Sequence, residues 1–160
     1  MLKEVSGDIL LTKAQVIAHG VAPGDGFNQG LAAGLRGDYP AMAKDFRHYC
    51  RIAHPKPGEI WVWAGADGRR VVNLMIQDEA PDKHAKPGAA TTHNVNVALR
   101  NLRHLIEKEG FESVALPRLA TGVGRLDWEE VWPLIGNHLG ELDIPVYVYT
   151  TFHSGQQAEE

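Results

Sequence analysis

Two glycine-rich segments contain the residues whose types and spacing suit binding chemistry. One follows the apolar run 16–21 and extends from Gly24 to Leu35, and the other follows the apolar run 113–116 and passes through Gly122 and Gly124. Each enters a helix, so backbone N–H groups and the positive end of the helix dipole would face an anion. Glycine also lets a phosphate approach the backbone closely. Together the two segments predict a diphosphate held from both sides.

Neither segment is a known nucleotide fingerprint. The spacing of Gly24, Gly26 and Gly30 is not G-x-G-x-x-G, and no Lys-Ser or Lys-Thr pair follows as in a P-loop. Either loop alone would serve equally well as a plain connection between a strand and a helix. The prediction of an anion site therefore depends on the pair.

Apolar periodicity predicts alternating strands and helices around these loops. Asp67 and Gly68 mark a hairpin turn, and Asp127 is the expected N-cap of the last helix. The predicted fold class is α/β, a three-layer α/β/α sandwich with a mixed central sheet, whose ligand lies at the carboxyl ends of the strands. The predicted strands span 2–5, 16–21, 59–64, 69–76, 113–116 and 145–150, and the helices span 30–36, 41–52, 91–109 and 128–139.

Composition indicates one domain, residues 1–153, followed by a short polar tail, residues 154–160, that is expected to fray. The net charge is -4, with Lys and Arg scattered, so no basic face for nucleic acid is expected. Cys50 is the one cysteine, which favours a core position and a reducing, cytoplasmic compartment. No membrane span is visible, and the eight histidines follow no metal-ligand spacing.

Five segments together resemble a known family by their order and spacing. They are Gly7-Asp8-Ile9, the strand ending near His19, the loop 28–32, the loop 117–128 and the strand Val146–Tyr149. From Leu2 to Tyr149 the chain is similar to a macrodomain, the ADP-ribose-binding module. The most similar branch contains the terminal ADP-ribose protein glycohydrolase and the DNA ADP-ribosyl glycohydrolase antitoxins.

The resemblance implies an ADP-ribose site. It implies that Asp8 contacts the adenine amino group, that Phe27 stacks on the ligand, and that Asn28 and Gln29 lie beside the distal ribose. His19 faces either this site or the core, and Arg118 is expected to pin the second loop through a buried carboxylate. The predicted ADP-ribose contacts are Asp8, Ile9, His19, Phe27, Asn28, Gln29, Gly30, Leu31, Pro117, Leu119, Ala120, Thr121, Gly122, Val123, Gly124 and Arg125.

The chain departs from this branch at its catalytic residues. Gln77 stands where the branch carries a nucleophilic lysine, and Gly124 stands where it carries an aspartate. Glutamine has no amine for a covalent adduct, so that mechanism is not expected. Lys83 and Lys86 lie further along the polar loop and are expected to be solvated.

A water-mediated hydrolysis remains, with Asn28, Gln77 and Asp78 holding the water and Asp78 as the general base. The predicted activity is removal of mono-ADP-ribose esterified to acidic side chains of proteins, with no cofactor and no metal. The expected partners are ADP-ribose or a mono-ADP-ribosylated protein. The alternatives are a reader that binds ADP-ribose without chemistry, and a hydrolase of ADP-ribose 1″-phosphate or O-acetyl-ADP-ribose.

Overall fold

A single six-stranded sheet forms the centre of the molecule. The computed structural model describes residues 1–82 and 84–160, and Lys83 lies outside the described residues. The strands lie in the order β1-β6-β5-β2-β4-β3. Neighbouring strands are parallel, except that β3 runs antiparallel to β4 across the predicted hairpin. The predicted mixed sheet is confirmed. The elements are β1 (Leu2–Gly7), the 3-10 turn η1 (Ile9–Leu11), β2 (Val16–Val21), α1 (Gly30–Asp38), α2 (Pro40–Ala53), β3 (Ile60–Ala64), β4 (Arg70–Met75), α3 (Thr92–Glu109), β5 (Val114–Pro117), α4 (Trp128–Leu139) and β6 (Val146–Phe152).

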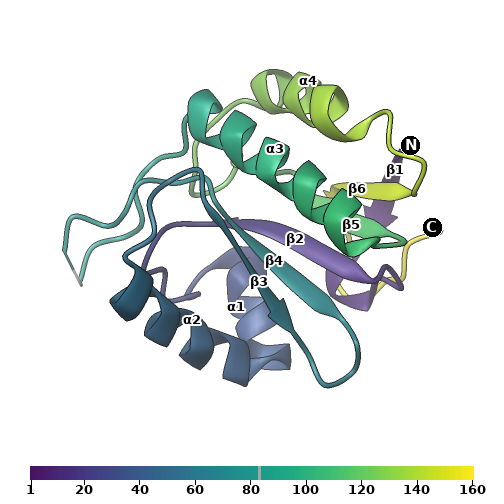
Figure 1. The fold of residues 1–160 in the computed structure, drawn as a ribbon. Coiled ribbons are helices and arrows are strands. Elements are labelled where there is room, and N and C mark those ends of the chain that lie inside the picture. The colour runs from purple at the N-terminus through teal and green to yellow at the C-terminus, as the bar shows by residue number, and fades with distance from the viewer. Residues whose placement is uncertain (83) are drawn as a thin grey trace.

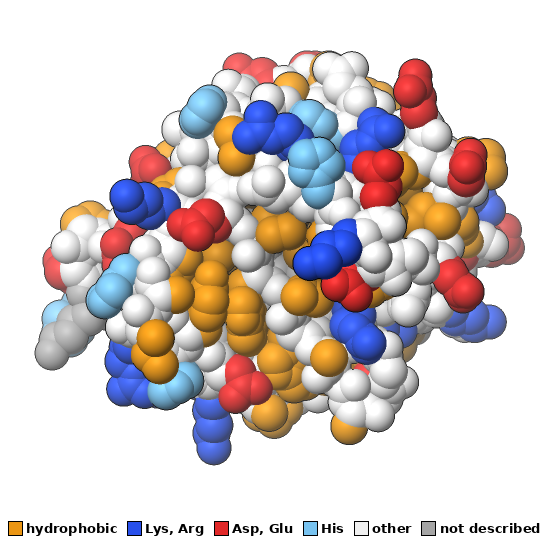
Figure 2. Space-filling view, viewed as in Figure 1, with side chains coloured by type: hydrophobic (Ala, Val, Ile, Leu, Met, Phe, Trp, Pro, Cys, Tyr) orange, Lys and Arg blue, Asp and Glu red, His pale blue; other side chains and the backbone are white. Residues whose placement is uncertain are grey.

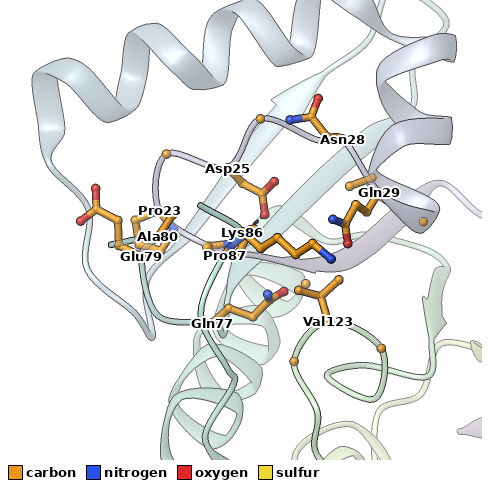
Figure 3. Close-up of a pocket in the computed structure, with 18 of the residues that line it drawn as sticks. Pro23, Asp25, Asn28, Gln29, Gln77, Glu79, Ala80, Lys86, Pro87 and Val123 are labelled. Atoms are coloured by element: carbon orange, nitrogen blue, oxygen red, sulfur yellow. Dashed lines mark hydrogen bonds between the residues drawn. The ribbon is translucent and has the colours of Figure 1, made fainter. Parts of the chain in front are cut away.

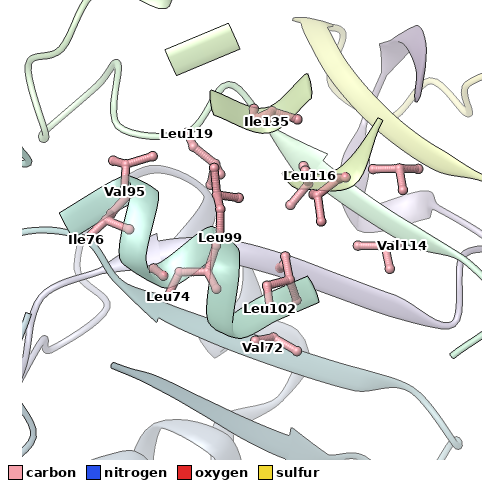
Figure 4. Close-up of a cluster of buried hydrophobic side chains, with 14 of the residues drawn as sticks. Val72, Leu74, Ile76, Val95, Leu99, Leu102, Val114, Leu116, Leu119 and Ile135 are labelled. Carbon is pink, nitrogen blue, oxygen red and sulfur yellow. The ribbon is translucent and has the colours of Figure 1, made fainter. Parts of the chain in front are cut away.

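Helices cover both faces of this sheet, as Figure 1 shows, with α3 and α4 on one face and α1 and α2 on the other. Each face has its own apolar core. On the α3 face, Leu99 and Leu102 of α3 pack against Val72 and Leu74 of β4 (Figure 4). On the other face, Phe46 of α2 is fully buried in the second cluster. The predicted three-layer sandwich is therefore confirmed.

The helix ends differ in a way that matters for the site. Thr91 caps α3 by accepting from the Asn94 N–H at 3.1 Å, and Asp127 caps α4 as predicted, in a capping box with Glu130. By contrast, the N-cap of α1 is Gln29, and its side chain makes no capping bond. The first N–H groups of α1 therefore remain available to another acceptor.

The prediction that the tail frays is wrong, because residues 153–160 fold back beside β1, where the C-terminus lies in Figure 1. The His153 N–H donates to the Gly7 carbonyl at 3.1 Å, and the Asp8 N–H donates to the Gln156 carbonyl at 2.7 Å. Gly155 makes the reversal possible with a φ of 72°. The Glu160 carboxylate accepts from the hydroxyls of Thr12 and Tyr149.

The face in view carries charges of both signs around a central group of hydrophobic side chains (Figure 2). On that face, Lys and Arg side chains are interspersed with Asp and Glu (Figure 2). Among the described residues, no helix is both long and apolar enough to cross a membrane.

Candidate ligand-binding site

A cavity of about 880 Å³ opens where β2, β4 and β5 end. Three segments line it, the loop from β2 to α1, the loop that follows β4, and the loop that follows β5 (Figure 3). Both glycine-rich loops lie on its walls, so the cavity is at the predicted carboxyl ends of the strands, while the position of the ligand stays a prediction.

The first wall is the N-terminal end of α1. The cavity is lined by Gln29, Gly30, Leu31 and Ala32, and the Ala33 N–H donates to the Gln29 carbonyl at 3.3 Å. Gly30 adopts a φ of 57°, which turns the chain into the helix. The uncapped N–H groups of this turn carry the positive end of the helix dipole to the cavity.

The second wall is the loop after β5. Two bonds close it, from the Leu126 N–H to the Ala120 carbonyl at 2.8 Å and from the Arg125 N–H to the Gly122 carbonyl at 3.1 Å. Within the described part of the chain, the N–H groups of residues 119–124 have no hydrogen-bond acceptor. A Cβ built on Gly122 would meet nothing within 4 Å, so the space in front of this loop is open. The two walls therefore present backbone donors to one cavity.

The polar side chains nearest the centre are Asp25, Gln77 and Lys86 (Figure 3). Asp25 shapes its own loop, because its carboxylate accepts from the Phe27 N–H at 2.9 Å and from the Ala22 N–H at 3.1 Å. Sequence reasoning missed Asp25, although its place between Gly24 and Gly26 marks it as the polar residue of that turn. It expected Lys86 to be solvated, and Lys86 is exposed, while its side chain also lines the cavity and extends toward Gln29 (Figure 3).

The structure brings most of the predicted site residues together and leaves six of them out. Those that line the cavity are His19, Asn28, Gln29, Gly30, Leu31, Gln77, Pro117, Leu119, Ala120, Gly122, Val123 and Gly124. Those that do not are Asp8, Ile9, Phe27, Asp78, Thr121 and Arg125.

Asp8 does not line the cavity, and both oxygens of its carboxylate already accept hydrogen bonds from backbone N–H groups of the chain. One carboxylate oxygen accepts from the Leu10 N–H at 3.0 Å and caps η1, and the other accepts from the Gly155 N–H at 2.9 Å. The side chain is 8% exposed. An adenine amino group at Asp8 would share this oxygen with the tail, so the implied contact stays a prediction.

Phe27 is not placed to stack on a ligand. Its ring is 1% exposed, with its centroid 5.1 Å from Phe46 and 6.0 Å from the His19 ring. Burial of an aromatic ring in the core is favourable, and the positive φ of 55° turns this side chain inward. The expectation for Arg118 is also wrong, because its guanidinium is exposed and lies 5.2 Å from the Trp128 ring centroid.

The predicted water-holding residues are only partly in place. The Gln77 amide donates to the Gly88 carbonyl at 3.1 Å, and the Asn28 carbonyl accepts from Arg36 at 2.8 Å. Asp78 does not line the cavity, whereas its neighbour Gln77 does. The prediction of Asp78 as general base is therefore wrong for this geometry.

Close packing, rather than a catalytic role, accounts for the glycine at position 124. A Cβ there would lie 2.7 Å from the Ala120 carbonyl oxygen and 3.0 Å from the Ala90 Cβ. An aspartate at this position would clash with the backbone, so this loop has no room for the residue that the related branch carries.

His19 lines the cavity at its floor and is held by a buried polar pair. Its Nε2 lies 2.7 Å from Asn73 Oδ1, while the Asn73 amide donates to the Trp61 carbonyl at 3.4 Å. Asn73 Oδ1 is therefore the acceptor and Nε2 carries the proton. Burial lowers the pKa of His19 to about 4, so the ring is neutral at neutral pH.

This buried histidine should make the fold sensitive to acid. The folded-state pKa of about 4 lies below the ordinary 6.5, so the stability that His19 contributes is complete above pH 6.5 and is lost as the pH falls toward 4. The expected loss is about 3 kcal/mol in the free energy of unfolding. Urea unfolding across this range should show it. His19→Gln, which keeps a donor for Asn73 and cannot titrate, should flatten the pH dependence, and an unchanged slope would contradict the assignment.

No group of three or more His, Cys, Asp or Glu side chains in the described residues is arranged to hold a metal ion. The cavity lining carries Lys86 and Arg118 beside backbone amides and amide side chains, together with the carboxylates of Asp25, Glu79 and Asp82. Its N–H groups and cations can bind an anionic ligand.

Comparisons with known proteins agree with this geometry. The chain is 26% identical over 160 residues to a DNA ADP-ribosyl transferase-DNA ADP-ribosyl glycohydrolase fusion protein of Thermosipho africanus, covering 92% of this chain and 41% of the relative. It is 30% identical over 95 residues to the human ADP-ribose glycohydrolase OARD1, covering 59% of this chain and 58% of that protein. The chain thus spans less than two thirds of either relative.

Comparison with solved structures points to the same group of proteins. The macrodomain of Thermus aquaticus DarG superposes with a TM-score of 0.81 at 25% identity, covering 94% of this chain and 98% of that one. The model of the Macro domain family matches residues 28–135, which include the first wall of the cavity from Asn28 onward and the whole of the second. The resemblance seen in the sequence is confirmed, and the chain belongs to the Macro domain family.

Proposed function

We propose that this domain binds ADP-ribose and removes mono-ADP-ribose from acidic side chains of proteins. The observation that carries the proposal is the pair of facing walls with unpaired backbone N–H groups, at the start of α1 and at residues 119–124. Such groups favour a diphosphate, since these N–H groups donate to no acceptor among the described residues and both phosphates need donors. A cavity of about 880 Å³ is also in the size range of small-molecule sites.

The related proteins support the same ligand and reaction type. The two relatives are named for ADP-ribosyl and ADP-ribose glycohydrolase activity. In the proposed pose the diphosphate lies between the two walls, the second ribose lies toward Gln77, and the adenine lies toward Asp8. We place the activity in the cytoplasm, because the single cysteine, Cys50, is free.

The proposed hydrolysis uses Asp25 in place of Asp78. A water held beside Asp25 and Gln77 attacks the ester carbonyl and transfers a proton to the Asp25 carboxylate. The bond between the carbonyl carbon and the ribose oxygen breaks, and the ribose oxygen takes the proton. The products are ADP-ribose and the free acidic side chain, and no cofactor takes part.

Two measurements on one sample test the proposal. Calorimetric titration of ADP-ribose should give binding, and incubation with glutamate-ADP-ribosylated protein should release ADP-ribose. Tight binding without release from this substrate would remove the hydrolase function for this linkage. No binding of ADP-ribose would remove the whole proposal.

The second candidate function is a reader of ADP-ribosylated protein. The observation that favours it is that Gln77 and Asn28 are already hydrogen-bonded within the protein, to Gly88 and Arg36. A reader would bind ADP-ribosylated protein and ADP-ribose alike and leave every linkage intact, including the 1″-phosphate and O-acetyl derivatives.

A further inference from the structure

Lys86 lines the cavity from the loop after β4. Its side chain extends across the cavity, from that loop toward Gln29 on the first wall and Val123 on the second (Figure 3). We propose that Lys86 is a positioning residue that binds the diphosphate between the two walls. The inference rests on the proposed function and adds a residue to it.

Hydrogen bonds fix the base of the loop that carries Lys86. The Gly88 N–H donates to the Asp78 carbonyl at 2.9 Å, and the Ala90 N–H donates to the Gly124 carbonyl at 2.9 Å. The second of these bonds joins the loop directly to the second wall. The Gln77 side chain adds a bond to the Gly88 carbonyl. Lys86 thus extends from a base that is anchored to the site.

Among the described residues, the ion pair joins Arg103 and Glu107, on the surface of α3, and Lys86 is in none. Lys86 faces a cavity whose opposite walls present N–H groups and a positive helix end, and whose lining also carries the carboxylates of Asp25, Glu79 and Asp82. A diphosphate between the walls would bring an anion of two charges within reach of the ammonium.

This arrangement also explains the composition of the loop. A lysine that only solubilised the loop would direct its ammonium into solvent, as the sequence suggested for this residue. Lys86 is exposed as expected, but its side chain lines the cavity and extends between the two walls that carry donors (Figure 3). The backbone N–H groups of the two walls can orient a phosphate but carry only partial charges. Lys86 adds a full positive charge.

Neutralising this one residue tests the inference. Calorimetric titrations of ADP-ribose and of ADP should give about tenfold weaker binding for Lys86→Gln than for the unmodified protein, because a charged contact to phosphate is lost. The loss should be the same for both ligands, since both carry the diphosphate. It should shrink as salt is raised, because screening weakens the contact in the unmodified protein. Lys86→Arg should restore most of the affinity.

Lys44→Gln is the matched control, because Lys44 is exposed on α2 and does not line the cavity. It should leave both affinities unchanged. Binding by Lys86→Gln within twofold of the unmodified protein would overturn the inference, as would a loss confined to ADP-ribose, which would place Lys86 on the second ribose. Reductive trapping of ADP-ribose on Lys86 with borohydride would overturn it too, because it would show a covalent role.

Pyrophosphate separates this inference from the proposed function. If ADP-ribose does not bind at all, the proposed function fails. Lys86 is then tested by titrating pyrophosphate, which needs neither nucleoside nor ribose. Binding of pyrophosphate to the unmodified protein that is lost in Lys86→Gln would support the inference alone, and equal behaviour of the two proteins would overturn it.

Discussion

Gly122→Glu is expected to abolish ADP-ribose binding while leaving the fold intact. A Cβ at Gly122 meets nothing within 4 Å, and the residue has no positive φ, so the protein itself accommodates a side chain there. The same open space is where the diphosphate would lie. A carboxylate within 4 Å of one phosphate charge costs about 4 kcal/mol at an effective dielectric constant of 20, roughly a thousandfold in affinity. Calorimetry should therefore detect no binding at micromolar concentrations.

Two further substitutions at Gly122 separate charge from bulk. Gly122→Gln adds nearly the same volume without charge, and Gly122→Ala adds only a methyl group. We expect intermediate affinity for the first and nearly unchanged affinity for the second. All three variants should melt at the temperature of the unmodified protein. A folded Gly122→Glu protein that still binds ADP-ribose would remove the second wall from the site.

The sequence predicted the parts of the site that depend on local backbone pattern. Both glycine-rich loops follow apolar strands and enter helices, and the structure places them on opposite walls of one cavity. The helix α4 begins at Trp128, directly after the predicted N-cap Asp127. Caps, turns and periodicity act between residues close in the chain, so one sequence was enough to find them.

The predictions were wrong or incomplete where contacts between residues far apart in the chain determine the position of a side chain. Asp8 is held by Gly155, from the far end of the chain, and no local pattern connects them. Phe27 turns into the core because Phe46 of α2 is there to receive its ring. Gln77 lines the cavity, and its neighbour in the chain, Asp78, does not. These outcomes depend on tertiary packing, which overrides local preference.

Gly124 and Gln77, the two positions at which the sequence predicts a departure from the related branch, both pack where two loops of the cavity meet. Gly124 packs against Ala120 and Ala90 too closely to admit a Cβ, and its carbonyl accepts from the Ala90 N–H. Gln77 forms an isolated bridge with the same Ala90 and bonds to Gly88 through its side chain. Both positions therefore serve the junction between the two loops.

Asp25→Asn is expected to slow release of ADP-ribose from glutamate-linked substrate by about 10²–10⁴-fold, the usual worth of a general base. Asp25 is the acidic side chain that points toward Gln77 and Lys86 in Figure 3. Asparagine keeps one oxygen to accept from Phe27 or Ala22 and loses the other acceptor. That lost hydrogen bond should weaken ADP-ribose binding by only about fivefold.

The contrast between rate and affinity makes this test decisive for the role of Asp25. Glu79→Gln is the matched control, because Glu79 lines the same cavity while its carboxylate points away from Gln77 (Figure 3). That variant should keep both the release rate and the affinity. If Asp25→Asn binds ADP-ribose and releases it from substrate as fast as the unmodified protein, Asp25 only shapes its loop. If rate and affinity fall together by the same factor, the carboxylate is needed for the binding loop and not for the proton transfer.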